Sequence, residues 1–457
     1  MRSPTATLKK LLRKRIHLSG YVIALVIVLL AALDLRVQSV RLSDIAEPLR
    51  TDAGEYVLYA YNLKNYGVYS KTDTWPEEGK TPVPQPDAVR VPGYPLFLSL
   101  FLGKVPQIEE LHYALIVQAL LSTATVLFAY LLSRRFLAPP FALAAAVLTA
   151  ASPHLVTMTI YALSETLFCL LLVLSMWLLA RMTETRRPFY IAAAGAALGA
   201  ASLTHPLVLY FIVPLVVFIG WYFRRHAGWN KALLVAVGFM AVCTPWVARN
   251  LITLGKPGDN LLFLTALRGG VYPDMIYPGH PELRGFPYVA DPRYEESSKD
   301  LGSVMREIFR SFQEAPGTEL RWYLLGKPAM VWSWDIIAGE GDVFVYLPLS
   351  SPYWYLPQFK VSHAAMAVTH TPLVILMTIG VVLAWVPWTR RRFDENQLFA
   401  IRLISLLLLY HLSIMIAGFP EPRYAVPMRP FMYAMAMMPL SLLWRGHFGR
   451  ARARSAR

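Results

Sequence analysis

Two acidic residues near the start of the chain, Asp52 and Glu55, are spaced as a pair that could do chemistry. They lie in the segment from Arg50 to Ala60, which reads as a short helix that begins after Thr51. Side chains three residues apart are neighbours on one helix face, and the first turn of a helix favours ionised carboxylates. The pair therefore fits a general base or a ligand of one divalent cation. Ordinary helix capping by Thr51 and Asp52 is the alternative interpretation.

An arginine follows the two acids in the same polar segment. Arg90 opens the sequence Arg90-Val91-Pro92-Gly93-Tyr94-Pro95, just before an apolar stretch. An arginine at a membrane surface can bind a phosphate through two parallel hydrogen bonds. Arg90 is therefore a candidate phosphate ligand, and an anchor at the lipid headgroups is an equally good interpretation of its position.

The composition identifies a polytopic membrane protein. The chain has 457 residues, of which 56% are hydrophobic and 16% are charged. Its apolar runs have the length that a helix needs to cross a bilayer, so we expect an all-α integral membrane fold with about ten transmembrane helices. These runs begin near Gly20, Leu111, Ala138, Ala162, Phe189, Pro206, Ala232, Ala364, Leu398 and Ala425.

The net charge of +15 follows the predicted membrane topology, so we expect no nucleic-acid partner. If the N-terminus is cytoplasmic, the segments on its side hold 22 of the 44 basic residues and three acids. The positive-inside rule then places both termini in the cytoplasm. We expect a multi-pass membrane protein with its working surface outside the cytoplasm.

Two long polar segments are predicted to form the extracytoplasmic working surface. Within the second, residues 301–315 read as an amphipathic helix. The predicted segments are the basic cytoplasmic N-terminus 1–19, a first transmembrane helix 20–33, the first extracytoplasmic loop 34–110 with the candidate base Asp52, a transmembrane bundle 111–247, the second extracytoplasmic loop 248–362, C-terminal transmembrane helices 363–444 and a basic cytoplasmic tail 445–457.

Further short motifs follow in a recognisable order. They are Leu163-Ser164-Glu165-Thr166, Leu203-Thr204-His205-Pro206, Thr244-Pro245-Trp246-Val247-Ala248-Arg249-Asn250 and Glu421-Pro422-Arg423-Tyr424. With the acidic helix and the Arg-x-Pro-Gly-Tyr-Pro sequence, they resemble the multi-spanning C-type glycosyltransferases (GT-C). The order is similar to that of the bacterial branch related to protein O-mannosyltransferases and the aminoarabinose transferase of lipid A (glycosyltransferase 39).

This sequence departs from the family pattern in two places. Ala53 and Gly54 separate Asp52 from Glu55, where adjacent acids are common, and His205 stands where arginine is expected as readily. The resemblance implies an inverting transfer of one sugar, a hexose or a pentose, from a polyprenyl-phosphate donor to a glycan, lipid or protein acceptor. The implied partners are this lipid-linked sugar, the acceptor and membrane lipid.

The resemblance assigns the base role to Asp52, which matches the family's catalytic aspartate, with Glu55 as a weaker candidate. The departing polyprenyl phosphate gains negative charge, which arginines in a low-dielectric cleft would stabilise. Arg429 lies one turn into an apolar span, where snorkelling to the interface is the alternative explanation. The candidate phosphate-binding residues are Arg90, Arg249, Arg423 and Arg429.

Tyr94, His205 and Tyr424 are the candidate substrate-binding residues, although a lone histidine at a helix junction is more often structural. Glu165, at the entrance of a span, is interpreted as a cap or a packing residue outside the catalytic set. Metal use is open, because Asp52 and Glu55 could share one divalent ion with further oxygen ligands.

Two non-enzymatic functions are the alternatives. The chain could translocate a lipid-linked sugar, or it could be a scaffold in an envelope glycan pathway. A transporter is expected to place charges near the middle of the membrane and to show repeat symmetry. The sequence shows neither feature, and its candidate polar residues gather on one predicted side, which favours surface chemistry.

Overall fold

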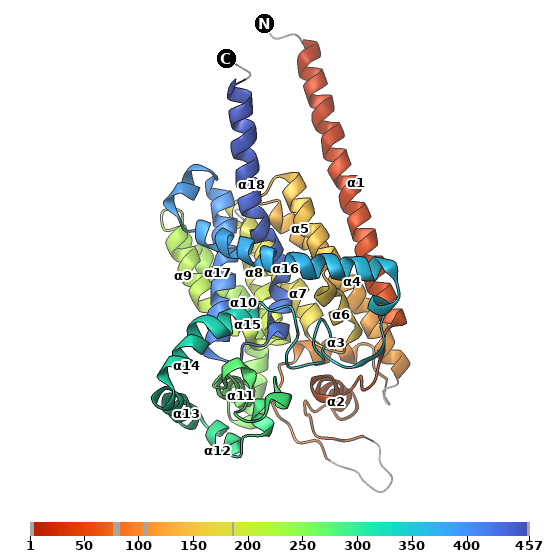
Figure 1. Ribbon diagram of the computed structural model, residues 1–457, viewed down its shortest axis with the longest axis vertical. Coiled ribbons are helices and arrows are strands. Elements are labelled where there is room, and N and C mark those ends of the chain that lie inside the picture. The colour runs from red at the N-terminus through yellow and green to blue at the C-terminus, as the bar shows by residue number, and fades with distance from the viewer. Residues whose placement is uncertain (1–3, 76–82, 104–107, 185–186, 455–457) are drawn as a thin grey trace.

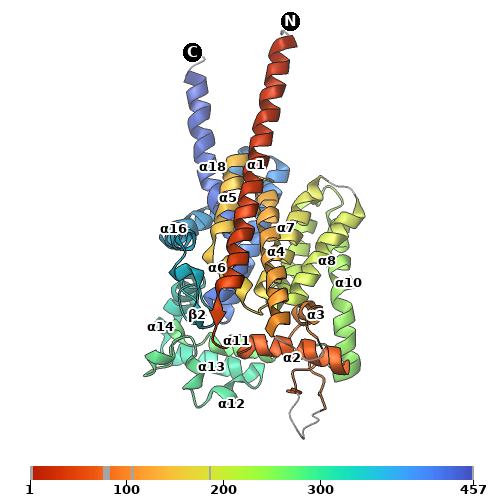
Figure 2. The ribbon, with the colours of Figure 1, turned by 90° about the vertical axis from the view of Figure 1, so that its right-hand side faces the viewer.

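A bundle of helices with polar regions at one end makes up the protein, which is described here by a computed structural model of residues 4–75, 83–103, 108–184 and 187–454 (Figures 1 and 2). The ends of the predicted basic head and tail, residues 1–3 and 455–457, lie outside the described residues. The expectation of an all-α integral membrane fold is confirmed. The long helices are α1 (Pro4–Leu42), α4 (Ile108–Ser133), α5 (Pro139–Ala151), α7 (Glu165–Ala180), α8 (Pro188–Thr204), α9 (Ile212–Tyr222), α10 (Gly228–Leu254), α16 (Pro357–Leu383), α17 (Glu395–Ala417) and α18 (Arg429–Arg454).

Each predicted apolar run contains a helix, but fewer helices than predicted are long and apolar enough to cross a membrane. Six meet that standard in the described part of the chain, namely α1, α4, α7, α10, α16 and α17. A seventh span is bent by 52° between α5 and the segment that starts with α6 (Pro153–Thr157). The helices α8 and α9 are shorter. The helix α8 begins with Pro188, and Pro206 begins the 3₁₀ helix η3 (Pro206–Phe211) that separates α8 from α9. A proline cannot continue the helix that precedes it, so each of these positions marks a boundary.

The first span is longer than the sequence predicted. The helix α1 continues past Leu33 to Leu42, although it carries Arg36. This arginine is fully buried because its guanidinium is satisfied by the bundle: Nε donates to Ser122 Oγ at 2.7 Å, and Nη1 donates to the carbonyl of Ala150 at 3.0 Å. The helix therefore continues through Arg36 because the bundle satisfies this charge, and the predicted end of the span at residue 33 is too early.

Both long polar segments lie at one end of the bundle, and both termini lie at the other end (Figures 1 and 2). A short antiparallel pair of strands joins the two segments. Predicted residues 301–315 form α13, whose N-terminus is capped by Asp300 through the backbone nitrogen of Ser303 at 2.8 Å. The elements at this end are β1 (Asp44–Ile45), α2 (Thr51–Tyr66), α3 (Gly93–Ser99), α11 (Leu261–Gly269), α12 (Tyr294–Ser298), α13 (Leu301–Glu314), α14 (Pro316–Arg321), α15 (Lys327–Val331) and β2 (Pro348–Ser350).

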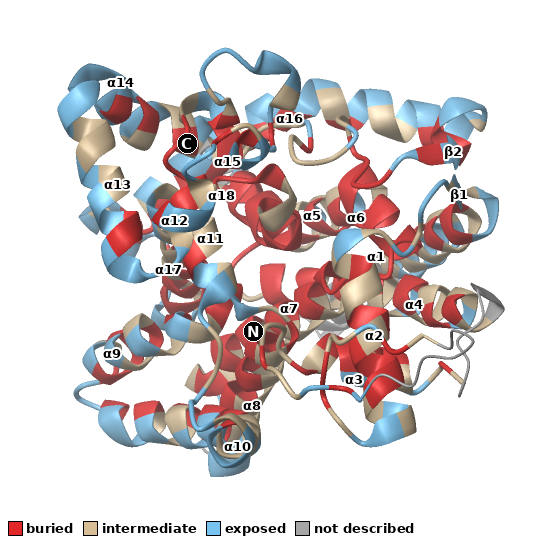
Figure 3. Cartoon of the chain, turned by 90° about the horizontal axis from the view of Figure 1, so that it is seen from below, coloured by how far each residue is buried: buried red, intermediate tan, exposed pale blue. Residues whose placement is uncertain are grey.

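One long apolar helix does not follow the direction of the others. The helix α16 runs across the bundle in Figure 1 and is seen end-on in Figure 2. It packs mainly on α18 through a buried face that includes His370, Leu373 and Met377, whereas Val368 and Ile375 on the opposite face are exposed. Buried residues are concentrated around α7 and α18 at the centre of the end view (Figure 3). The helix α16 is thus a lateral layer on this core.

Candidate active site

Asp52, Glu55 and Arg90 meet at the end of the bundle that carries the large loops. Both acids project from the first two turns of α2, and Arg90 lies just before α3. Arg90 Nη2 lies 2.6 Å from Asp52 Oδ1, and Arg90 Nε lies 2.6 Å from Glu55 Oε2. The guanidinium carbon also lies 5.4 Å from the ring centroid of Tyr56. The two predicted acids therefore bind the same predicted phosphate ligand.

Arg423 reaches the same aspartate from the C-terminal part of the chain. It lies in the short 3₁₀ helix η10 (Pro422–Met428), and its Nη2 is 3.1 Å from Asp52 Oδ2. Its Nε donates to Glu165, the first residue of α7, whose side chain is 2% exposed. Three parts of the sequence thus form an alternating row of charges, which we call the ion-pair chain: Glu55, Arg90, Asp52, Arg423 and Glu165.

Helix capping does not explain the acids on α2. Arg50 occupies the N-cap position and makes no side-chain capping hydrogen bond. The hydroxyl of Thr51 lies 3.3 Å from the hydroxyl of Tyr346, and the Asp52 carboxylate is turned toward Arg90 and Arg423. The capping interpretation is therefore wrong, and the ion pairs account for the orientation of Asp52.

The second large loop holds the start of α2 in place. Arg50 Nη2 donates to Glu340 Oε1 at 2.7 Å and to the carbonyl of Val345 at 3.2 Å. The hydroxyl of Tyr346 accepts from the backbone nitrogen of Ala53 at 3.4 Å. Residues of both large loops therefore fix the helix that carries Asp52.

Opposing effects set the charge of Asp52. Burial disfavours its ionised form, but Arg423 and Arg90 together outweigh burial and lower the pKa of Asp52 below its ordinary value. The carboxylate is therefore ionised at pH 7 and able to accept a proton. Its basicity is low as long as both arginines stay bound to it, because each positive neighbour favours the unprotonated form.

A further acid, Glu421, lies beside Arg423 in the sequence but is used differently. Its carboxylate accepts hydrogen bonds from the backbone nitrogens of Ala338 at 3.0 Å and Arg423 at 3.4 Å. Burial raises the pKa of Glu421 to about 7, against the opposing effect of these hydrogen bonds and of the Arg423 charge. Glu421 thus titrates near neutral pH at the junction that positions Arg423.

Two of the predicted phosphate ligands lie outside the ion-pair chain. Arg249 Nη1 donates to the carbonyl of Asp87 at 2.7 Å, and its Nη2 donates to the carbonyl of Tyr69 at 3.0 Å. These bonds attach the first large loop to the end of α10. Arg429 is buried in α18, where its Nη1 lies 3.2 Å from Nδ1 of His370 on α16. Both arginines are engaged in packing in this structure.

Tyr94 contacts Arg90 indirectly, through the ring of Tyr56. Its ring is fully buried, and its hydroxyl donates to Gln118 Oε1 at 2.7 Å. Its ring packs edge-on against Tyr56, with the centroids 5.0 Å apart, and Tyr56 is the ring that lies against Arg90. The predicted substrate-binding residue Tyr94 is thus placed one layer behind the charged groups.

His205 and Tyr424 lie beside each other, and Tyr424 directly follows Arg423 in the chain. Their ring centroids are 5.7 Å apart, and His205 also stacks on Phe168 at 5.1 Å. His205 Nδ1 accepts from the backbone nitrogen of Leu207 at 3.3 Å, and burial lowers the pKa of His205 to about 4. The ring is therefore neutral at pH 7 with its proton on Nε2, which can donate a hydrogen bond.

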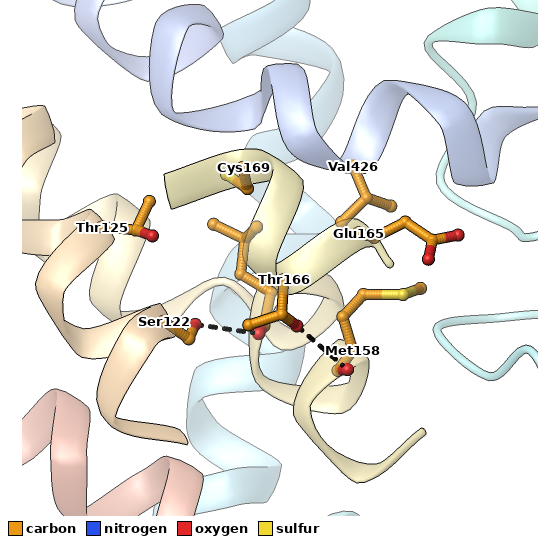
Figure 4. A pocket seen from close by; sticks show the side chains of 8 residues that line it. Ser122, Thr125, Met158, Glu165, Thr166, Cys169 and Val426 are labelled. Carbon is orange, nitrogen blue, oxygen red and sulfur yellow. Dashed lines mark hydrogen bonds between the residues drawn. The ribbon is translucent and has the colours of Figure 1, made fainter. Parts of the chain in front are cut away.

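Sequence reasoning missed the contribution of Glu165. An acid in the first turn of an apolar helix has an ordinary explanation as a helix-end residue, and its partner Arg423 is remote in the sequence. Glu165 also borders a cavity of about 10 Å³ with Thr166, Cys169 and Ser122, shown in Figure 4. Its Oε2 is buried and has no hydrogen-bond partner among the described residues, whereas the other oxygen binds Arg423. Glu165 is therefore a positioning residue for Arg423.

Asp52 and Glu55, which could have shared a divalent ion, are arranged differently. Asp52 and Glu55 are both turned onto Arg90, a cation that competes for the same oxygens. Within the described ranges, no group of three or more His, Cys, Asp or Glu side chains is arranged to hold a metal ion. We therefore derive no chemical step through a metal.

Known proteins resemble this chain in sequence and in fold. A family model described as dolichyl-phosphate-mannose-protein mannosyltransferase matches residues 92–248. The oligosaccharyltransferase of Archaeoglobus fulgidus, solved with a tethered acceptor peptide, superimposes with a TM-score of 0.50 and 14% identity over 94% of this chain and 50% of that chain. The ArnT protein of Cupriavidus metallidurans gives a TM-score of 0.40 and 14% identity over 88% of this chain and 77% of that chain.

These comparisons define the class of the protein. No curated protein sequence matches the chain. The chain spans about half the length of the oligosaccharyltransferase, whose low identity makes this a likeness of fold. The protein is thus a multi-pass membrane protein with the GT-C fold. The predicted resemblance to the protein O-mannosyltransferases is confirmed, through a match that covers α3 to most of α10.

Proposed function

We propose that the protein is an inverting glycosyltransferase that moves one sugar from a polyprenyl-phosphate donor to an acceptor on the extracytoplasmic side of the membrane. The observation that carries this proposal is the position of Asp52 between Arg90 and Arg423, with one carboxylate oxygen toward each guanidinium. The proposed base therefore directly contacts both proposed phosphate-binding groups. The matched family's description, which names a sugar linked to dolichyl phosphate, supports this donor class.

The proposed reaction uses these groups in two roles. The acceptor hydroxyl attacks the anomeric carbon from the face opposite the phosphate, and its proton passes to the Asp52 carboxylate. A new bond joins the acceptor oxygen to the anomeric carbon, while the bond from that carbon to the phosphate oxygen breaks. The electron pair leaves on the polyprenyl phosphate, where Arg90 and Arg423 stabilise the added negative charge.

Donor binding would also activate the base. The donor phosphate competes with Asp52 for both guanidinium groups, and each contact that moves to the phosphate weakens the positive field at the carboxylate. The pKa of Asp52 would then rise toward its ordinary value, and its basicity would increase as the donor is bound. Glu165 and Glu55 keep the two arginines near the site during this exchange.

The test is mass spectrometry of polyprenyl-linked sugars and envelope glycans in a deletion strain that carries the wild-type protein, Asp52→Asn or Glu55→Gln. We expect Asp52→Asn to reduce transfer at least about a hundredfold, with one lipid-linked sugar accumulating and one glycan losing it. The weaker candidate is the matched control, so Glu55→Gln should reduce transfer less. If the deletion alters the glycan but Asp52→Asn does not, the translocating or scaffold function would replace the enzyme.

A further inference from the structure

A large cavity lies at the end of the bundle opposite the ion-pair chain. It has a volume of about 950 Å³, is open to solvent on one side, and is bordered by the hairpin between α9 and α10, the start of α8, and the first turns of α17. This is the end at which α1 and α18 carry the two termini (Figure 1). Its walls combine aromatic and aliphatic side chains, such as Trp221 and Leu234, with polar ones.

The charges in this cavity are strongly one-sided. Its basic side chains are Arg224, Arg225, Lys231, Arg390 and Arg402, and Glu395 is the acid in its lining. Arg224, Arg225 and Arg390 are exposed, and none of the three pairs with an acid in the described residues. Five basic groups around one concave surface raise the local concentration of anions, since a low-dielectric wall focuses their field.

Arg402 shows that the cavity is more than a charged surface. It lies in the third turn of α17 and is 5% exposed, yet it lines the cavity. Its Nε donates to the carbonyl of Ala384 at 3.0 Å, and its guanidinium lies 5.4 Å from the ring centroid of Trp385. Its two Nη atoms make no hydrogen bond within the described chain, and they are not sealed inside the protein, so they are accessible from the cavity. A mostly buried guanidinium that keeps two donor groups accessible from a cavity can form paired hydrogen bonds to an anion bound there.

We propose that this cavity binds a phosphate group, with Arg402 at its inner wall and Arg224 and Arg225 at its rim. Guanidinium groups bind phosphate oxygens through paired, charge-assisted hydrogen bonds. The apolar side chains that share the lining, including Ile191, Leu234 and Leu398, suit the hydrocarbon part of a lipid. An anionic phospholipid headgroup and a soluble phosphate both present the required chemistry.

This site is separate from the proposed catalytic site. Asp52 and Arg423 lie at the large-loop end, and none of the cavity residues contacts them in the described structure. The site therefore does not depend on glycosyl transfer, and Asp52→Asn should leave its occupancy unchanged.

The test measures lipid and phosphate binding to the purified full-length protein by native mass spectrometry and thermal unfolding. The probes are phosphatidylglycerol, zwitterionic phosphatidylcholine and inorganic phosphate. Arg224→Gln/Arg225→Gln removes two rim charges, and Arg391→Gln/Arg392→Gln is the matched control. The control pair is exposed and close in sequence to Arg390, but it does not line the cavity.

We expect the cavity variant to bind phosphatidylglycerol about tenfold more weakly than wild type, with the control variant within about twofold of wild type. Arg402→Gln, checked for folding by its melting temperature, should lower affinity by at least as much. Stabilisation by inorganic phosphate that the cavity variant loses would identify a soluble phosphate as the ligand of the same site. Equal losses in the cavity and control variants, or no loss in either, would overturn the proposal, because the attraction would then come from general surface charge.

Discussion

At the residue scale, the structure brings together charged residues that the sequence analysis identified separately. Asp52, Arg90 and Arg423 were predicted from the chemistry that transfer from a phosphate requires. Their mutual contacts were not predictable, because Asp52 and Arg423 are joined only by tertiary structure. Arg249 was chosen by the same chemical reasoning, yet backbone carbonyls of the first loop use its guanidinium. Residue type therefore indicated the candidates, and tertiary packing determines which of them contact Asp52.

Arg423 and Arg249 should consequently fail in different ways. Arg423→Ala removes a cation from Asp52 and from the proposed donor phosphate, so we expect the KM for the donor to rise by about a hundredfold. It also leaves the buried Glu165 carboxylate without its partner, so the melting temperature should fall as well. Arg249→Ala removes two hydrogen bonds that fasten a loop, so it should lower the melting temperature with a donor KM near that of wild type. Steady-state kinetics and thermal unfolding on both variants check this contrast. A donor defect confined to Arg249→Ala would reverse the assignment.

Glu421 provides a pH prediction at the same scale. Its pKa is raised from an ordinary value of 4.5 to about 7 in the folded protein, so the folded state holds the proton more tightly than the unfolded state. Its contribution to stability is therefore full below about pH 4.5 and is lost as the pH rises through about 7. The loss is at most about 3 kcal/mol. The melting temperature of wild type should fall between pH 5 and 8 more than that of Glu421→Gln, and equal slopes would exclude this group as the source.

At the scale of elements, close backbone contacts fix the helices that were predicted only as apolar runs. The helices α8 and α10 touch along small residues: a methyl group at Gly238 would lie 1.9 Å from the carbonyl oxygen of Ala192, and one at Gly195 would lie 2.0 Å from that of Val235. Small residues allow such contacts between helices in a membrane. Periodicity predicts that these helices exist, but it does not identify their partners.

Gly238→Ala should therefore destabilise the α8–α10 pair by about 2 kcal/mol or more, because the two backbones must separate. Val237→Ala is the matched control, since Val237 is exposed on the same turn of α10. Melting temperature and the yield of monodisperse protein measure the difference. If both variants unfold like wild type, the contact does not limit stability.

At the scale of the whole molecule, the apolar runs in the sequence predicted a multi-pass bundle. They did not predict how the helices are arranged in space. The crosswise course of α16 and the bend after α5 depend on which surfaces fit each other, as in the contact of α16 with α18. Arg36 shows the same limit, because the first span was predicted to end at residue 33, whereas the helix continues and the bundle buries the Arg36 side chain. Patterns of hydropathy record exposure to lipid along one helix, and they carry little information on the neighbouring helix.

Sidedness is the prediction on which the proposed reaction depends at this scale. The distribution of basic residues predicts that the terminal end faces the cytoplasm and the large loops face outward. Glu296→Cys places a thiol at the large-loop end, and Arg225→Cys places one at the terminal end, both at exposed positions. Native Cys169 and Cys243 are buried, so they should react slowly.

A membrane-impermeant maleimide applied to intact spheroplasts should label Glu296→Cys and spare Arg225→Cys, and both should react after the membrane is permeabilised. The reverse pattern would place Asp52 on the cytoplasmic side. A donor carried on the outer leaflet could not reach it there, so the extracytoplasmic transfer would be wrong, even though the GT-C fold and the ion-pair chain would stand. Because the thiols are placed at opposite ends of one rigid bundle, each serves as the internal control for the other.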